Sequence, residues 1–277
     1  MKLDLKRSLI STSVVAALGF CAAAHATNGY FSNAYSTDSL GLAGAGEALP
    51  QDAMAAAVNP AGMVWIGDRL DLSLALFSPL RSYKAGTPPP QPYPGALPTN
   101  GYVKSNSNLF FIPGIGYNHM LNPDMSVGIT VYGNGGMNTD YPSDNPSAGS
   151  YSGAFGGGSA GVNLNQLFIA PSFAQKLDGG NVSWGVSLIL AYQQFSAKGL
   201  AAFTQAPAGF PAPPTLYPND VTNNGTDSST GVGANLGVMF KVAPNFTVGA
   251  NFQPKITMSK FKKYQGLFAN AGEFDIP

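Results

Sequence analysis

Side chains able to do acid–base, nucleophilic or metal chemistry are scarce in this chain. Its 277 residues include one cysteine, Cys21, and two histidines, His25 and His119. Zinc sites draw on cysteine, histidine and carboxylate ligands, and a serine or cysteine nucleophile needs a base such as histidine beside it. With so few of these residues, the sequence predicts no metal site, no cofactor and no enzyme activity.

Glycine spacing and charge offer no nucleotide or nucleic-acid chemistry either. Gly41, Gly44 and Gly46 resemble a phosphate-cradling loop, but no strand precedes them and no lysine follows at the required position. The 14 Lys and Arg residues balance the 14 Asp and Glu residues, so the formal net charge is zero. Without a basic footprint, we expect no nucleic-acid partner.

The composition is apolar and poor in charge. Only 10% of the residues are charged and 44% are hydrophobic, with 34 glycines and 22 prolines. A typical soluble domain carries about 25% charged residues. Such a chain must place a large apolar surface away from water.

Residues 1–26 have the features of a secretory signal peptide. A basic start with Lys2, Lys6 and Arg7 precedes an apolar stretch that ends in the small-residue site Ala24-His25-Ala26. We therefore expect export and cleavage after Ala26. No later segment offers the roughly 18 uninterrupted apolar residues of a membrane-spanning helix.

From residue 69 onward the apolar residues recur with a period of two, which indicates strands. Seven runs follow this pattern, at 70–77, 109–120, 126–132, 164–177, 182–193, 231–242 and 246–258. Most are long enough for the ~9–11 residues of a tilted membrane-spanning strand. Long connections at 79–108, 134–161 and 198–230 alternate with tight ones at 121–124, 178–181 and 243–245.

This sorting of loops is typical of an outer-membrane β-barrel and not of a soluble β-sandwich. The barrel would direct Leu, Val, Ile and Phe toward lipid, and Gly, Ser, Asn, Gln and Thr toward a polar, uncharged lumen. We expect a monomer in the outer membrane of a Gram-negative bacterium, in contact with lipid and lipopolysaccharide. Aromatic residues near strand ends suit interfacial girdles: Phe77, Tyr117, Tyr132, Trp184, Tyr192 and Phe246.

Residues 27–68 do not alternate. A short helix-like stretch runs from Gln51 to Val58, and the Asn59-Pro60 pair should end it. The small and apolar residues of this segment favour burial, so we expect a plug inside the lumen in preference to a free periplasmic tail.

This segment resembles the start of the FadL-type outer-membrane long-chain fatty-acid transporters. The resemblance is carried by GLAGAGEA at 41–48, Gln51-Asp52-Ala53 and NPAGM at 59–63. Residues 128–141 (GITVYGNGGMNTDY) resemble the third strand of that family and the glycine region after it. Residues 231–264 fit its sixth and seventh strands.

The resemblance implies an all-β transmembrane barrel of fourteen strands whose lumen is blocked by an amino-terminal hatch. It divides the chain into a signal peptide (1–26), a hatch (27–68) and a barrel (69–277) that holds about seven strands and is incomplete at its carboxyl end. The residues to which it gives roles are the hatch motif Asn59, Pro60, Ala61 and Gly62, and the wall-opening kink Gly133, Gly135 and Gly136.

By the same resemblance, the protein is a passive channel for hydrophobic small molecules, with long-chain fatty acids as the leading substrate. Substrate is captured at the outer loops and released sideways past the hatch. Lys84, Lys104 and Lys198 are candidate contacts for a fatty-acid carboxylate. Uptake of aromatic hydrocarbons, and an adhesin or structural barrel, are the alternatives left open.

Overall fold

Seven antiparallel strands form the main sheet, in the order β1-β4-β5-β6-β7-β8-β9. The computed structural model describes residues 31–84, 102–143, 154–155, 158–204 and 216–277, so the expected signal peptide lies outside the described residues. The strands are β1 (Arg69–Phe77), β4 (Phe110–Asn122), β5 (Met125–Asn138), β6 (Gly161–Leu177), β7 (Val182–Lys198), β8 (Asp227–Ala243) and β9 (Phe246–Phe252). All seven strands predicted from the sequence are confirmed.

Shorter elements precede, connect and follow these strands. A small second sheet pairs β2 (Ser82–Tyr83) with β3 (Val103–Lys104). The helices are α2 (Thr37–Gly41), α3 (Ala55–Val58) and α4 (Ala269–Gly272), with 3-10 turns η2 (Pro60–Trp65), η4 (Asp178–Gly180), η5 (Ala201–Phe203), η6 (Pro218–Asp220) and η7 (Lys262–Tyr264). Within the described ranges, no helix is long and apolar enough to cross a membrane.

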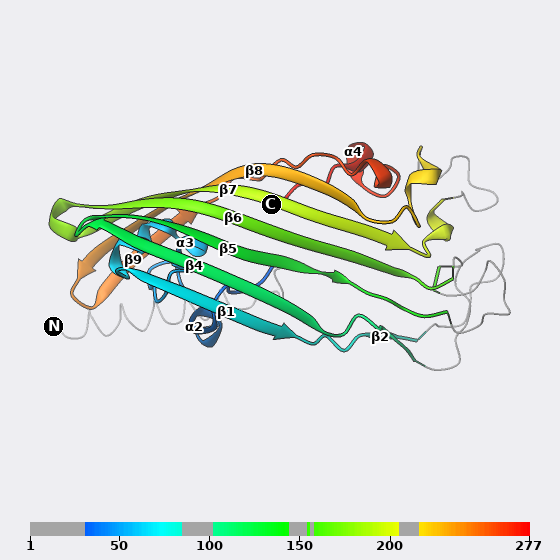
Figure 1. Cartoon of the computed structure of the whole chain (residues 1–277), viewed down its shortest axis with the longest axis horizontal. Helices are drawn as coiled ribbons and strands as arrows, with labels where there is room; N and C mark the ends of the chain where they lie inside the picture. Colours follow the sequence, from blue (N-terminus) through cyan, green and yellow to red (C-terminus); the bar gives the residue numbers. More distant parts are fainter. Residues whose placement is uncertain (1–30, 85–101, 144–153, 156–157, 205–215) are drawn as a thin grey trace, which may run out of the picture.

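The two faces of the main sheet differ as the alternation predicts. The leucines of β1 are exposed on the outer face, with Leu72 at 72% exposure. On the inner face lie buried polar side chains such as Ser126, Thr130 and Ser187. Figure 1 shows the strands side by side along a curved sheet, with the amino-terminal helices packed against it.

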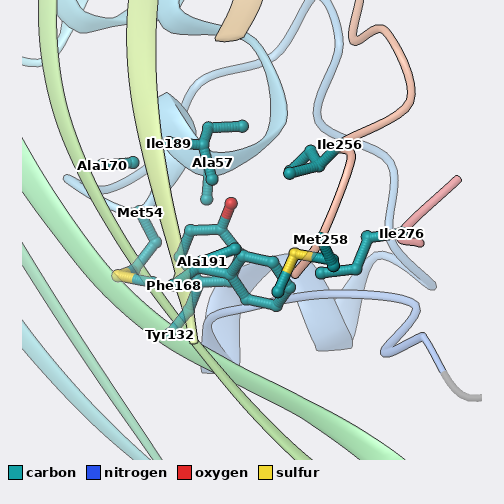
Figure 2. Packing of buried hydrophobic residues seen from close by; sticks show 10 residues of the cluster. All are labelled: Met54, Ala57, Tyr132, Phe168, Ala170, Ile189, Ala191, Ile256, Met258 and Ile276. Atoms are coloured by element: carbon teal, nitrogen blue, oxygen red, sulfur yellow. The ribbon is translucent and has the colours of Figure 1, made fainter. Parts of the chain in front are cut away.

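The inner face also carries apolar residues, which the sequence analysis did not expect. Tyr132 and Phe168 stack with ring centroids 5.1 Å apart. They belong to a buried cluster, shown in Figure 2, that also holds Met54 of the amino-terminal segment, whose described part is residues 31–68. Tyr132 is only 4% exposed, so its assignment to an outer aromatic girdle was wrong. A large ring there covers the amino-terminal segment instead of meeting lipid.

The last strand is shorter than predicted. β9 ends at Phe252, whereas the alternation continues to residue 258. Pro254 cannot donate to a strand ladder, and the chain turns back across the inner face. Ile256 pairs with Ile276, and Met258 pairs with Gly231 of β8. Ile256 and Met258 are therefore buried inside, not directed toward lipid.

The amino-terminal segment lies directly on the inner face of the sheet. The expected helix over 51–58 forms only as α3, over Ala55–Val58, and ends at Asn59 as predicted. Glycines on five strands allow the segment to come close. A Cβ atom on Gly185 would lie 2.5 Å from the carbonyl carbon of Pro60, closer than a real Cβ contact allows. Other inner-face glycines with segment atoms within 3 Å of such a Cβ are Gly116, Gly128, Gly237 and Gly249.

Candidate functional site: an opening between two strands

The main sheet is split between β4 and β5 over part of its length. The β4–β5 ladder stops at the pair Ile115–Val131. Beyond that point β4 still pairs with β1 as far as Phe110, and β5 still pairs with β6 as far as Asn138. The two strands therefore separate while each keeps its other neighbour.

Local sequence explains why the ladder ends there. Pro113 of β4 has no N–H group and cannot contribute a donor to the missing pairs. On β5, the pairing with β6 shifts register between Gly135 and Asn138, as expected of a β-bulge, which bends its strand. Gly135 has φ +155°, and a Cβ atom there would lie 2.8 Å from the carbonyl oxygen of Leu164. The register shift thus requires glycine at this position.

A cavity of about 320 Å³ occupies the gap, and we call it the wall cavity. It is lined by Phe77, Phe110, Phe111, Ile112, Pro113, Ile115, Val131, Gly133, Asn134, Gly135, Asn138, Asn165, Gln166 and Leu167. Phe111 and Ile115 belong to the exposed outer face, whereas Asn134 and Gln166 are buried on the inner face. The wall cavity is therefore bounded by residues of both faces of the sheet.

A second cavity of about 300 Å³, the segment cavity, adjoins it on the side of the amino-terminal segment. The two cavities share Ile112, Pro113 and Gly133 in their linings. The other lining residues come from the segment and from β1, β5: Ser32, Ala34, Tyr35, Ser36, Thr37, Leu40, Ser73, Leu74, Ala75, Leu76 and Tyr132. A small apolar solute would thus meet a continuous lining from the segment to the outer face.

The amino-terminal segment is attached to β5 beside the opening. The backbone N–H of Ser32 donates to Asn134 Oδ1 over 2.9 Å, and Asn134 Nδ2 donates to the hydroxyl of Tyr35 over 3.5 Å. The Tyr35 ring packs against the ring of Tyr132, with the two ring centroids 4.4 Å apart. Any displacement of residues 32–35 would therefore change the inner end of the opening.

The predicted kink glycines lie at this opening. Gly133 and Gly135 line the wall cavity, and Gly136 follows within the stretch of β5 where the register changes. A Cβ atom on Gly133 would meet only ordinary contacts, at 3.4 Å from the Gln166 carbonyl oxygen and 3.7 Å from Ile112. A methyl group at Gly133 would therefore just fit, and a larger side chain would fill part of the wall cavity.

The predicted motif residues lie elsewhere, between the segment and β7, β8 and β9. Asn59 Nδ2 donates to the carbonyl oxygens of Glu47 (2.7 Å), Val238 (3.2 Å) and Ala250 (3.4 Å). Ser183 Oγ of β7 donates to the carbonyl oxygen of Ala61. Pro60 and Gly62 are buried in the adjoining 3-10 turn. These four residues join the segment to the sheet and do not line the opening.

The three predicted lysines are not part of either cavity lining. Lys198 forms an ion pair with Asp140 over 2.7 Å, and the Lys84 ammonium lies 5.9 Å from the ring centroid of Tyr102. Lys104 lies in the small β2–β3 sheet. In the described ranges, no group of three or more His, Cys, Asp or Glu side chains is placed to hold a metal ion.

Sequence reasoning did not find the polar residues of the opening. Asn134 stands inside the quoted GITVYGNGGMNTDY run, and its place on the inner face follows from the alternation. Gln166 carries no motif signal. Its bond partner Gln193 lies on β7 and bonds in turn to Phe274 near the end of the chain, and no local pattern encodes these contacts.

Solved structures with a similar fold include two toluene transporters and a FadL homologue. The toluene transporter TodX of Pseudomonas putida aligns with a TM-score of 0.57 at 17% identity, over 84% of this chain and 56% of that structure. The toluene transporter TbuX of Ralstonia pickettii gives 0.55 at 19% identity, over 84% and 59%. A FadL homologue of Pseudomonas aeruginosa gives 0.52 at 18% identity, over 82% and 53%.

The chain thus spans slightly more than half the length of these structures. No protein of curated function matches the sequence significantly. The model of one family, described as outer membrane protein transport protein (OMPP1/FadL/TodX), matches residues 18–273. This match covers nearly the whole sequence and agrees with the seven-stranded sheet. The chain therefore belongs to the OMPP1/FadL/TodX family of outer-membrane transport proteins, which are not enzymes.

Proposed function

We propose that this protein is a passive outer-membrane channel through which hydrophobic small molecules leave sideways, by the opening between β4 and β5. The observation that carries this proposal is the wall cavity, which is bounded by both faces of the sheet where the ladder is interrupted. An apolar solute gains about 25 cal/mol per Å² of surface removed from water. Release into the membrane core keeps that surface out of water at every step.

In this proposal residues 27–68 act as a hatch. Their described part is fixed to the inner face by Asn59 and Ala61 and to β5 by Ser32. Solute captured among the outer loops would pass the segment cavity before it reaches the wall. Lys84, Lys104 and Lys198 are proposed to act only at the capture stage, because they lie outside both cavity linings.

Two substrate classes are the candidates for this route. Long-chain fatty acids are the leading expectation from the family resemblance. TodX and TbuX, which share the fold, are toluene transporters, and this supports aromatic hydrocarbons. A structural or adhesive barrel would need no gap in its wall, so the interrupted ladder favours transport over that alternative.

The test is uptake of radiolabelled oleate and radiolabelled toluene by a Gram-negative strain that lacks its own channels of this family and carries this gene. Gly133→Val should reduce uptake several-fold, because the added methyl groups extend from a Cβ already 3.7 Å from Ile112 and narrow the gap. Gly41→Val is the control, since a Cβ atom at Gly41 has no neighbour within 4 Å in the described part of the chain. Unchanged uptake by a folded Gly133→Val protein would contradict the lateral route.

A further inference from the structure

The wall cavity has an unusual polar character. Of the described residues that line it, all those with polar side chains are carboxamides, namely Asn134, Asn138, Asn165 and Gln166, and none is charged. The described lining of the segment cavity adds hydroxyl groups but likewise no charged residue. A carboxylate that entered this route would therefore lose its hydration without meeting a cation, which is strongly unfavourable.

Hydrogen bonds fix the orientation of one of these carboxamides. The backbone carbonyl of Phe274 can only accept, and Gln193 Nε2 donates to it over 2.9 Å. The oxygen of Gln193 must then face Gln166, whose Nε2 donates to it over 3.0 Å. The amide nitrogen of Gln166 therefore faces Gln193, and the amide oxygen of Gln166 points away from this pair of hydrogen bonds.

Among the described residues, that oxygen has no hydrogen-bond partner although it is buried. Gln166 is 4% exposed and Gln193 is fully buried, and Gln166 Oε1 is among the buried polar atoms without a partner. Turning the Gln166 amide over would place its oxygen against the oxygen of Gln193. A buried acceptor left without a donor is costly. A donor supplied by a ligand would remove that cost.

Aromatic side chains surround the same cavity. Phe77 and Phe110 lie with ring centroids 6.2 Å apart, and Phe111 extends the apolar lining toward the outer face. A flat apolar body with a single hydroxyl group would satisfy both parts of the site. Its ring would pack on the phenylalanines and its O–H would donate to Gln166.

We propose that Gln166 makes the opening selective for uncharged aromatic compounds that carry one hydroxyl donor, of the phenol type, over carboxylates and over hydrocarbons without a donor. This inference rests on the proposed function, since it assigns the substrate class of the same route.

The test measures binding of p-cresol, toluene and p-toluate, which share one ring and one methyl group, to the full chain in detergent. Equilibrium dialysis at pH 8, with protein-free micelles subtracted, should show p-cresol bound about three- to tenfold more tightly than toluene, as one neutral hydrogen bond allows. The anion p-toluate should bind at least ~10-fold more weakly than p-cresol.

The variant Gln166→Leu should abolish the preference for p-cresol over toluene while toluene binding persists. Gln194→Leu is the matched control, because Gln194 is exposed and bonds to Tyr192 on the other face of the sheet. Equal binding of p-cresol and toluene, or tight binding of p-toluate, to the unmodified protein would overturn the inference but leave the proposed function standing. Binding of none of the three would overturn both. If Gln166→Leu fails to fold, the relative binding of the three ligands to the unmodified protein still tests the inference.

Discussion

At the scale of single residues, Asn59 connects the amino-terminal segment with the sheet. Its side chain is 1% exposed, and its Nδ2 has acceptors on the segment, β8 and β9. Asn59 Oδ1 also accepts the backbone N–H of Ala61 and so caps η2. An aliphatic side chain in this buried position could form none of these hydrogen bonds.

Replacing Asn59 with leucine should therefore destabilise the docked segment by about 1–3 kcal/mol, because each hydrogen bond lost costs about 0.5–1.5 kcal/mol. The measurement is a urea titration followed by the fluorescence of Trp65, in a background with Trp184→Phe. Asn219→Leu is the control, because Asn219 is exposed and contributes its backbone oxygen to a bond from Asn224. Equal urea midpoints for the Asn59 and Asn219 variants would show that the Asn59 side chain does not stabilise the docked segment.

Residue roles could be predicted only where the sequence carried a local signature. The NPAGM run singled out Asn59, and the GNGG run singled out Gly133 and Gly135 before their surroundings were known. The bond partners of Asn59 lie 179 and 191 residues away on β8 and β9, so its contacts could not be foreseen. Gln166 depends in the same way on Gln193 and Phe274.

At the scale of elements, period-two alternation predicted every strand of the main sheet because each strand has one face against lipid and one against the interior. The same rule failed at the end of β9. Ile256 and Met258 continue the pattern, but their apolar partners are Ile276 and the inner cluster. Alternation reports that two faces differ and does not report which of them is covered by another part of the chain.

The inner-face glycines of the strands allow the amino-terminal segment to pack against the sheet. Gly185→Ala would place a methyl group 2.5 Å from the Pro60 carbonyl carbon and 2.6 Å from the Ala61 nitrogen. Backbone cannot rotate away as a side chain can, so the segment must shift. We expect a loss of about 1–3 kcal/mol, typical of overpacking.

The urea titration of Trp65 fluorescence measures this loss as well. Gly133→Ala is the matched control within the sheet, because its methyl group would make only ordinary contacts. A Gly185→Ala protein as stable as Gly133→Ala would mean that the segment is not pressed against β7.

At the scale of the whole molecule, a member of this outer-membrane family should have the outer face of its sheet in lipid, whereas the amino-terminal segment lies on the inner face. The two tryptophans of the chain report on these two places. Trp184 lies on β7 between the inner-face residues Ser183 and Gly185, so its side chain points outward. There its ring centroid lies 5.6 Å from that of Phe173. Trp65 belongs to η2 and donates to Ser183 Oγ from the inner side.

Brominated phospholipids quench tryptophan on contact and therefore distinguish the two faces. In vesicles of such lipid, a Trp65→Phe protein, which keeps Trp184, should lose far more fluorescence than a Trp184→Phe protein, which keeps Trp65. Trp184 follows the tight β6–β7 turn by only a few residues, so bromine near the headgroup should quench it more than bromine near the end of the acyl chain. Trp65 is shielded further by Lys241, whose ammonium lies 3.5 Å from its ring centroid, because a charged group keeps acyl chains away. Equal quenching of the two single-tryptophan proteins would mean that lipid reaches both faces, and the assignment of an inner and an outer face would then be wrong.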